Sequence, residues 1–249
     1  MRHAFFASPH PLVFAHRGGA GLAPENTLAA FDHATQLGVD GFELDVRLSR
    51  DGVVVVHHDA TLERTTPLSG AVSAYTAAEL RDAGVPALGD VLERYDVPRL
   101  IVELKVDEAR FAEATLSVVR ECRAEARVCL GAFGVTALRA IRRRAPEIAC
   151  SAAREEVRWA LYRSWVHWPF GACAYHGFQV PERAGAIRVV SPRFVRAAHA
   201  AGLGVQVWTV NHEDAARRLL SWGVDALITD RPDLIGPIVR AHQSHKVET

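Results

Sequence analysis

Short apolar runs alternate with longer amphipathic stretches along the whole chain. Helical patterns at 27–37, 192–201 and 213–222 end at glycines, and Asn26 is the expected N-cap of the first. Eight strand–helix units in a chain of this length predict an α/β fold, a (β/α)₈ TIM barrel that forms a single domain over 1–249. Most of the eight apolar runs lack polar alternation, as strands buried on both faces of a parallel sheet do. The runs are 12–16, 41–46, 100–106, 127–132, 148–152, 172–180, 205–210 and 225–230.

A ninth apolar run, at 53–56, follows the second strand too closely to be a barrel strand. Only six residues separate the two, whereas a parallel crossover needs about a dozen or more. Residues 50–52 are Arg-Asp-Gly, a tight-turn signal, so we expect a small antiparallel hairpin after strand two, in an insertion of about 47–75. Counting back from the turn places three residues beside Glu43 and Asp45: His57, His58 and Asp59.

Acidic side chains gather where the predicted strands end, which is where barrel enzymes carry their working residues. Glu43 and Asp45 are two apart and share one face of a strand, and Glu103 lies at the end of another. Three carboxylates that converge at a barrel mouth repel one another unless a cation lies between them. An all-oxygen ligand set predicts one divalent cation, Mg²⁺, Ca²⁺ or Mn²⁺, rather than Zn²⁺.

Basic side chains accompany these acids. Arg17 and Lys105 supply positive charge for an anion, and the guanidinium fork suits phosphate oxygens best. His16 and His58 titrate near neutral pH, which suits a displacement that takes up one proton and releases another. A divalent cation, an anion clamp and two histidines together indicate phosphodiester cleavage.

Each of these residues also has a plainer explanation when it is taken alone. Glu43 and Asp45 are compatible with solvated positions of an edge hairpin, and Trp208 with the core. Glu103 and Lys105 form, on this interpretation, a same-face ion pair of small energy. The functional interpretation is favoured because charged residues recur at the same end of successive strands. Burying them there without a ligand or metal is costly.

Several motifs have a recognisable order and spacing. They are AHRGG at 15–19, APENT at 23–27, GVDGFELDV at 38–46, DGVVVVHHD at 51–59 with TLERTT at 61–66, ELK at 103–105, WTVN at 208–211 and TDRP at 229–232. With these motifs the chain resembles the glycerophosphodiester phosphodiesterase family from residue 12 to about 235. One departure is GAF at 131–133, where that family often has Ser-Phe at the end of strand five.

The resemblance implies a (β/α)₈ barrel with an insertion after strand two and metal-dependent hydrolysis of glycerophosphodiesters to glycerol 3-phosphate and an alcohol. It implies that His16 and His58 are the acid–base pair, without saying which is acid and which is base, or whether a cyclic phosphate forms first. His58 is preferred to His57 because Asp59 follows it, as in the family pattern. The implied metal ligands are Glu43, Asp45 and Glu103, and the residues implied to line the phosphate and glycerol site are Arg17, Lys105 and Trp208.

Two other functions stay open at this point: a lysophospholipase-D-like hydrolase acting on lysophospholipids, and a binding barrel without activity. The intact histidines and acids disfavour the second. The stretch 159–170 bears on the first, because it contains Trp159, Trp165 and Trp168. We expect these rings to pack the outer helix layer against the barrel. The alternative is that two of them lie at the mouth and hold an acyl chain.

Composition excludes some classes of partner. The chain has 29 Lys and Arg against 29 Asp and Glu, which gives no electrostatic reason to expect nucleic acid. No apolar run approaches the roughly 20 residues that span a bilayer, so any lipid contact is expected to be peripheral. We expect a cytoplasmic protein, because residues 1–14 lack the features of a signal peptide and the four cysteines have no C-x-x-C spacing.

Overall fold

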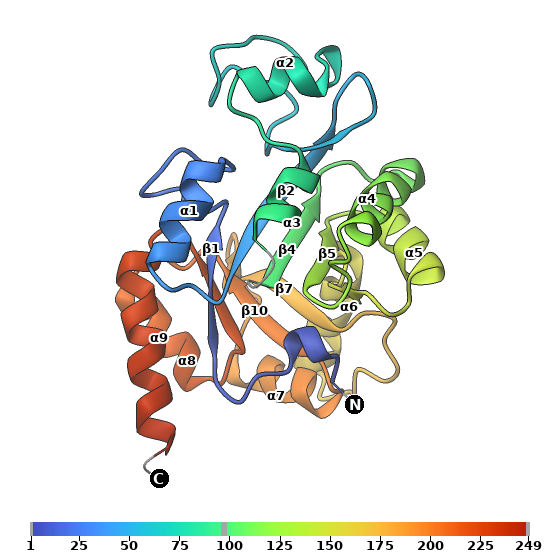
Figure 1. Ribbon diagram of the computed structural model, residues 1–249. Coiled ribbons are helices and arrows are strands. Elements are labelled where there is room, and N and C mark those ends of the chain that lie inside the picture. The colour runs from blue at the N-terminus through green and yellow to red at the C-terminus, as the bar shows by residue number, and fades with distance from the viewer. Residues whose placement is uncertain (1, 96–98, 248–249) are drawn as a thin grey trace.

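The computed structural model describes residues 2–95 and 99–247, in which eight parallel strands form a barrel surrounded by helices (Figure 1). The predicted fold class is confirmed. The strands neighbour one another in the order β6-β5-β4-β2-β1-β11-β10-β7, and a parallel bridge between Ser151 and Gly177 joins the two ends of this sheet. The barrel strands are β1 (Leu12–His16), β2 (Gly41–Leu48), β4 (Arg99–Leu104), β5 (Val128–Ala132), β6 (Ala149–Cys150), β7 (Gly177–Pro181), β10 (Gly204–Trp208) and β11 (Ala226–Thr229).

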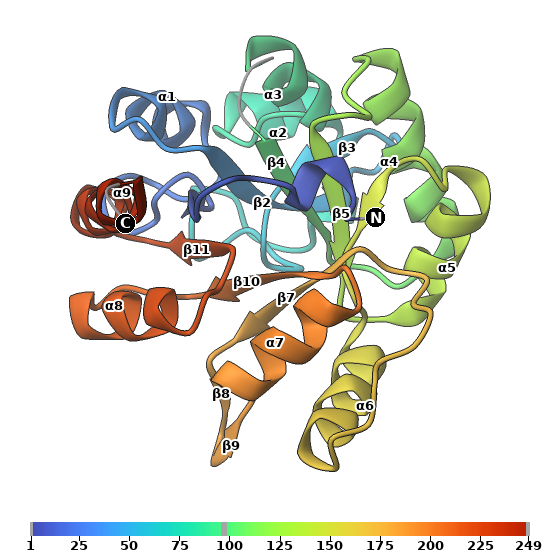
Figure 2. The same cartoon turned by 90° about the horizontal axis from the view of Figure 1, so that it is seen from below.

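Helices cover the outside of the barrel, as the view along its axis shows (Figure 2). Their apolar faces and the outward side chains of the strands form two large buried clusters. Within the described residues, no helix is both long and apolar enough to span a bilayer. The helices around the barrel are α1 (Leu28–Gln36), α3 (Leu88–Arg94), α4 (Ala109–Glu121), α5 (Val135–Arg144), α6 (Arg154–Trp165), α7 (Pro192–Ala200), α8 (Glu213–Ser221) and α9 (Pro232–Val247).

The predicted hairpin extends strand two beyond the barrel. β3 (Val54–Val56) pairs antiparallel with β2, and Val56 lies opposite Val46. After β3 the chain forms η2 (Val72–Ala74) and α2 (Ala77–Asp82), which lie above the barrel in Figure 1. A small apolar cluster that includes Leu62 and Leu80 holds this lobe together.

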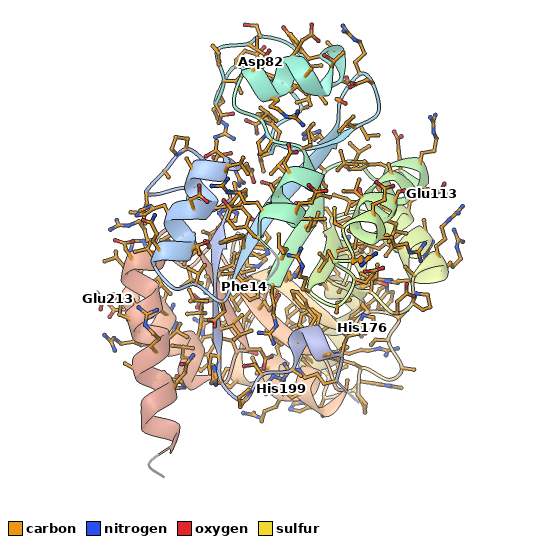
Figure 3. The ribbon with its side chains drawn as sticks, viewed as in Figure 1. Phe14, Asp82, Glu113, His176, His199 and Glu213 are labelled. Carbon is orange, nitrogen blue, oxygen red and sulfur yellow. The ribbon has the colours of Figure 1, made fainter. Side chains whose placement is uncertain are left out.

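The inward positions of the strands change from apolar to polar along the barrel axis. Side chains two apart on a strand point to the same face, so every second residue enters the barrel. In β1 the inward residues are Leu12, Phe14 and His16, and in Figure 3 Phe14 lies in the middle of the barrel. The same change runs from Ile101 to Glu103 in β4. These two strands therefore deliver a polar residue to the carboxyl end of the barrel.

An aromatic plug closes the opposite end. The short helix η1 (Ala4–Phe6) crosses the opening and buries Phe5 and Phe6 in the barrel interior (Figure 2). Gly177 and Gly204 leave room for Phe6, because a Cβ at either position would lie 2.5 Å from its ring. The N-terminal segment thus completes the core.

Two strands are shorter than their predicted apolar runs by three residues or more. Residues 172–176 precede β7 and are not strand, and the run 148–152 contributes only Ala149–Cys150 as β6. Tyr175 explains the longer apolar signal, because it is buried against Phe178 from an irregular segment. An apolar run records burial, and burial does not require strand pairing.

Candidate active site

The eight predicted site residues line one cavity of about 90 Å³ at the carboxyl end of the barrel. Strand ends and short loops place them there, and the hairpin after β3 contributes His58. Ile101, Gln179 and Ile228 also line the cavity without having been singled out from the sequence, and so does Phe133, which belongs to the departure at 131–133. The predicted residues are His16, Arg17, Glu43, Asp45, His58, Glu103, Lys105 and Trp208.

Three carboxylates in this cavity are arranged as a cation site. Glu43, Asp45 and Glu103 each offer an oxygen within 4.8 Å of the others, and Glu43 and Asp45 are buried. Burial, together with the charge of Asp45, raises the pKa of Glu43 to about 8. A divalent cation would stabilise the ionised form of such a buried carboxyl group. An all-oxygen donor set suits Mg²⁺, Ca²⁺ or Mn²⁺. The residues present therefore fit the predicted metal.

The Lys105 ammonium lies inside this acidic cluster. Its Nζ is 2.8 Å from Asp45 Oδ1 and 2.5 Å from Glu103 Oε1. Burial opposes the charged form of Lys105, but the two carboxylates outweigh burial, so the pKa of Lys105 is raised. Lys105 is therefore a fixed positive charge that offsets part of the cluster's negative charge.

Asn26 has a different place from the one expected. Thr27, not Asn26, caps α1, because the Thr27 side chain accepts a hydrogen bond from the Ala30 N–H. Asn26 is buried with a φ of +58°, and its Nδ2 donates to Asp45 Oδ2 at 3.0 Å. Either residue fits a cap by type alone, so the sequence could not separate them. Asn26 instead holds Asp45 in place.

Arg17 follows β1 in a tight loop that turns its backbone into the site. Its φ is +52°, and its N–H donates to Glu43 Oε2 at 3.2 Å. Gly18, with a φ of +84°, leaves no space for a Cβ, which would lie 2.8 Å from the Ala30 side chain. The Arg17 guanidinium lies 3.2 Å from Asp45 Oδ2 and donates to Glu25.

His16 is oriented by a carboxylate that follows β11. Its Nδ1 lies 2.6 Å from Asp230 Oδ1, and a carboxylate only accepts, so Nδ1 carries the proton. Asn211 donates to the other oxygen of Asp230. Burial opposes the charged imidazole, but Glu43 and Asp230 outweigh it and raise the pKa of His16. The Nε2 atom faces the cavity, 3.7 Å from Glu43.

His58 is oriented in the same way by its own neighbour. Its Nδ1 lies 2.7 Å from Asp59 Oδ1, while Arg64 donates to Asp59 Oδ2. These hydrogen bonds, that of Arg64 first, lower the pKa of Asp59 to about 2. Arg64 also donates two hydrogen bonds to Glu25, which in turn binds Arg17. A single network thus connects His58 in the hairpin with Arg17 in the β1 loop.

His57 points away from this cavity. Its backbone N–H donates to the Asp45 carbonyl, as the predicted register requires, but its side chain is buried and bonds the Thr61 carbonyl. Glu25, Arg64 and Asp230 had no role in the prediction, and Asp59 served only to prefer His58 to His57. The only sequence signal for them is that they lie within the APENT, HHD, TLERTT and TDRP motifs.

The tryptophan stretch contradicts both expectations for it. Trp159, Trp165 and Trp168 are 67%, 52% and 66% exposed, so they do not pack the helix layer against the barrel. None of them lines the cavity at the mouth, and Trp168 lies in a different surface cavity beside α7. The buried residues of α6 are Ala160, Leu161 and Ser164, so the helix packs on the barrel without these rings.

Oriented imidazoles and buried charges at the carboxyl end of a (β/α)₈ barrel define a class of protein, the barrel enzymes that perform acid–base chemistry on an anionic substrate. The model of the glycerophosphoryl diester phosphodiesterase family matches residues 16–234, and the chain belongs to this family. It is a phosphoric diester hydrolase.

Similar proteins cover nearly the whole chain. A Mycobacterium tuberculosis protein named probable glycerophosphodiester phosphodiesterase 2 is 35% identical, over 92% of this chain and 91% of its own. A glycerophosphodiester phosphodiesterase of Caldanaerobacter subterraneus is 31% identical, over 92% and 98%. A solved phosphodiesterase structure from Oleispira antarctica, in complex with the product sn-glycerol-3-phosphate, superposes with a TM-score of 0.77 at 30% identity, over 93% and 97%.

Proposed function

We propose that this enzyme hydrolyses glycerophosphodiesters to glycerol 3-phosphate and an alcohol, with one divalent cation held by Glu43, Asp45 and Glu103. One observation carries the proposal. Two imidazoles, each oriented through Nδ1 by a carboxylate, border the same small cavity as the acidic cluster. The Oleispira relative, which holds sn-glycerol-3-phosphate as its product, supports the choice of substrate.

In this mechanism each histidine moves one proton. An oxygen nucleophile, either water or the glycerol 2-hydroxyl, bonds to phosphorus and gives its proton to one imidazole. The bond from phosphorus to the alcohol oxygen breaks, and the other imidazole protonates that oxygen. If a cyclic phosphate forms first, water opens it with the same two groups in exchanged roles. The Arg17 guanidinium is placed to neutralise charge on the phosphate oxygens, and the cation, when bound, supplies further positive charge there.

A panel of glycerophosphodiesters tests the proposal. Purified protein with added Mg²⁺, Mn²⁺ or Ca²⁺ should release glycerol 3-phosphate from glycerophosphocholine and glycerophosphoethanolamine, measured by coupled oxidation of that product. Bis(p-nitrophenyl) phosphate serves as a diester without glycerol. Turnover of that compound without turnover of any glycerol diester would contradict the proposed substrate.

Peripheral lipid contact is part of the proposal, through the outer face of α6. Trp159 and Tyr162 lie one helical turn apart and are both exposed. Arg163 and Arg193 donate to backbone carbonyls of Phe170 and Trp165, so these two arginines belong to the same region of the chain. Exposed aromatic rings next to arginines suit the surface of a bilayer that contains anionic lipid.

Co-sedimentation tests this contact. The enzyme should bind phosphatidylglycerol vesicles more than phosphatidylcholine vesicles, and Trp159→Ala with Trp165→Ala should reduce binding. Equal sedimentation of the double variant would contradict the contact, and a change of oligomeric state in the variant would assign the face to a second copy.

We further propose that residues 1–249 act as a single catalytic domain, in which the insertion of about 47–75 supplies His58. The family match over 16–234 supports this extent. The cytoplasmic location stays a proposal, which the free thiols of all four cysteines support. Cell fractionation with an antibody against the protein tests the location.

A further inference from the structure

A second, larger pocket opens beside the catalytic cavity. Its volume is about 450 Å³, within the range of about 300–1,000 Å³ that small-molecule sites occupy. The two spaces share four lining residues, Glu103, Phe133, Gln179 and Trp208. A ligand whose phosphate lies in the small cavity can therefore extend into the larger pocket past Phe133 and Trp208, whose rings meet edge to face 6.3 Å apart.

Small residues create this space. Gly131, at the end of β5, lines the pocket, and a Cβ there would lie 3.0 Å from Gln179 Oε1 and 3.1 Å from Ser151 Oγ. Ala132 and Ala152 also line the pocket. The departure from the family pattern at 131–133 thus falls on the wall of this pocket. The proposed catalytic residues are untouched by it.

Most of the pocket lining is apolar. α6 contributes one wall, and the hairpin of β8 (Arg183–Ala184) and β9 (Ile187–Arg188), which projects outward in Figure 2, contributes another. The apolar side chains include Val157, Leu161, Val180, Ile187 and Val189.

Charged groups of the lining lie only at its borders. Glu103 belongs to the shared boundary, and Arg154 and Arg158 are exposed at the rim, with the Arg154 guanidinium 4.8 Å from the Phe133 ring. Inside this pocket a sugar or charged head group would find few uncharged polar side chains, Ser151 and Gln179, to replace its hydration. A hydrocarbon chain loses nothing of that kind and gains from burial.

We propose that this pocket binds a hydrocarbon chain attached to the phosphodiester whose phosphate occupies the catalytic cavity. The proposal rests on the proposed function and names a substrate class within it. Two kinds of phosphodiester carry such a chain. In a lysophospholipid the chain is an acyl group on glycerol, and in an alkyl ester of glycerol 3-phosphate it belongs to the released alcohol.

Two substrate series, both kept below their micellar concentrations, test the proposal. One runs from hexanoyl to decanoyl lysophosphatidylcholine, and the other from the ethyl to the octyl ester of glycerol 3-phosphate. Each methylene that the pocket buries should raise kcat/KM about fourfold, so we expect an increase of about tenfold or more along at least one series. The series that rises identifies the source of the chain, and a rise in both shows that either chain enters.

Glycerophosphocholine separates the two ways in which the test can fail. A flat response in both series, with glycerophosphocholine still hydrolysed, overturns the chain pocket and leaves the proposed function standing. Loss of turnover on every diester, glycerophosphocholine included, overturns the proposed function itself.

A matched pair of variants locates the chain. Ile187 lines the pocket, Val166 lies outside it after α6, and both side chains are 49% exposed, so neither substitution removes a core residue. Ile187→Asp and the space-filling Ala184→Trp should abolish most of the chain-length gain and leave glycerophosphocholine kcat/KM within about twofold. Val166→Asp should change neither the chain-length gain nor kcat/KM for glycerophosphocholine. An undiminished gain in both pocket variants overturns the assignment.

Discussion

The two ends of the barrel are made from the same strands and hold opposite chemistry. At the amino end, Phe5 and Phe6 fill the opening with apolar rings that two glycines accommodate. At the carboxyl end, Glu43 and Asp45 are buried, and cations, amides and backbone N–H groups compensate their charges. One end lowers the free energy of the fold, whereas the other holds charges that burial disfavours.

This difference shows that the charged site at the carboxyl end depends on stability that the apolar parts of the barrel supply. Buried carboxylates with a raised pKa are costly, and proteins retain such groups where function needs them. Substitutions at the mouth should therefore change turnover more than stability, and substitutions at the plug should do the reverse. Variants at the two ends should therefore differ in how far they lower turnover and how far they lower stability.

The largest effect should come from removing the cation. Excess chelator should lower turnover of glycerophosphocholine by about 10³-fold or more, because a Lewis acid supplies several kcal/mol of transition-state stabilisation. Adding Mg²⁺, Mn²⁺ or Ca²⁺ should restore it. Glu43→Gln should prevent the restoration while the protein stays folded by circular dichroism. Full activity in excess chelator would refute the metal site.

The next largest effect on turnover should come from replacing the two histidines of the site. His16→Ala and His58→Ala should each lower kcat by about 10²-fold or more, since each acid or base contributes on the order of 10²–10⁴. His57→Ala is the matched control. It removes a buried hydrogen bond to the Thr61 carbonyl and should lower the free energy of unfolding by about 1 kcal/mol, with kcat within a few fold. An essential His57 beside a dispensable His58 would reverse the assignment.

A smaller effect is expected for Arg64, which acts through other residues. Arg64→Gln removes the hydrogen bonds to Asp59 and Glu25 that hold His58 and Arg17, and should lower kcat about tenfold. Arg64→Lys should recover part of the loss, and the pH dependence of kcat should shift with it. Arg50→Gln, which breaks a surface ion pair with Glu79, should leave kcat and its pH profile unchanged.

The plug should affect stability alone. Phe6→Ala opens a cavity beneath Gly177 and Gly204 and should lower the free energy of unfolding by about 3–5 kcal/mol in urea titration. At temperatures where the variant is folded, kcat and KM should stay near those of the parent. A kcat that falls as steeply as in His16→Ala would show that the two ends are not separable.

His176 should give the smallest effect, visible only as pH dependence. Burial and the nearby His3 lower the pKa of His176 to about 4, and its Nδ1 accepts the Cys150 N–H. The unfolded imidazole titrates near 6.5, so stability should fall as pH drops from about 6.5 to about 4, by on the order of 2 kcal/mol once the shift of this half-buried group is discounted for solvent screening. His176→Asn keeps an acceptor without titrating. A pH profile of unfolding as steep as the parent's would contradict this.

The pattern of apolar runs determined the barrel, the order of its elements and the hairpin. Buried strands leave a local signature, and six residues cannot form a crossover. The spacing of two between Glu43 and Asp45 also put their side chains on one face. For the same local reason, the end of each strand pointed to the residues that line the cavity.

Only the tertiary structure decided which partners complete the site. Thr27 and Asn26 are equivalent as caps by type, yet Asn26 binds Asp45, and Arg64 reaches across 39 positions to Glu25. The apolar pocket likewise combines β5, α6 and the β8–β9 hairpin, while the tryptophans of α6 face outward. Local periodicity reports that a residue is apolar or polar. The contacts it makes depend on chain segments far apart in sequence, which only packing brings together.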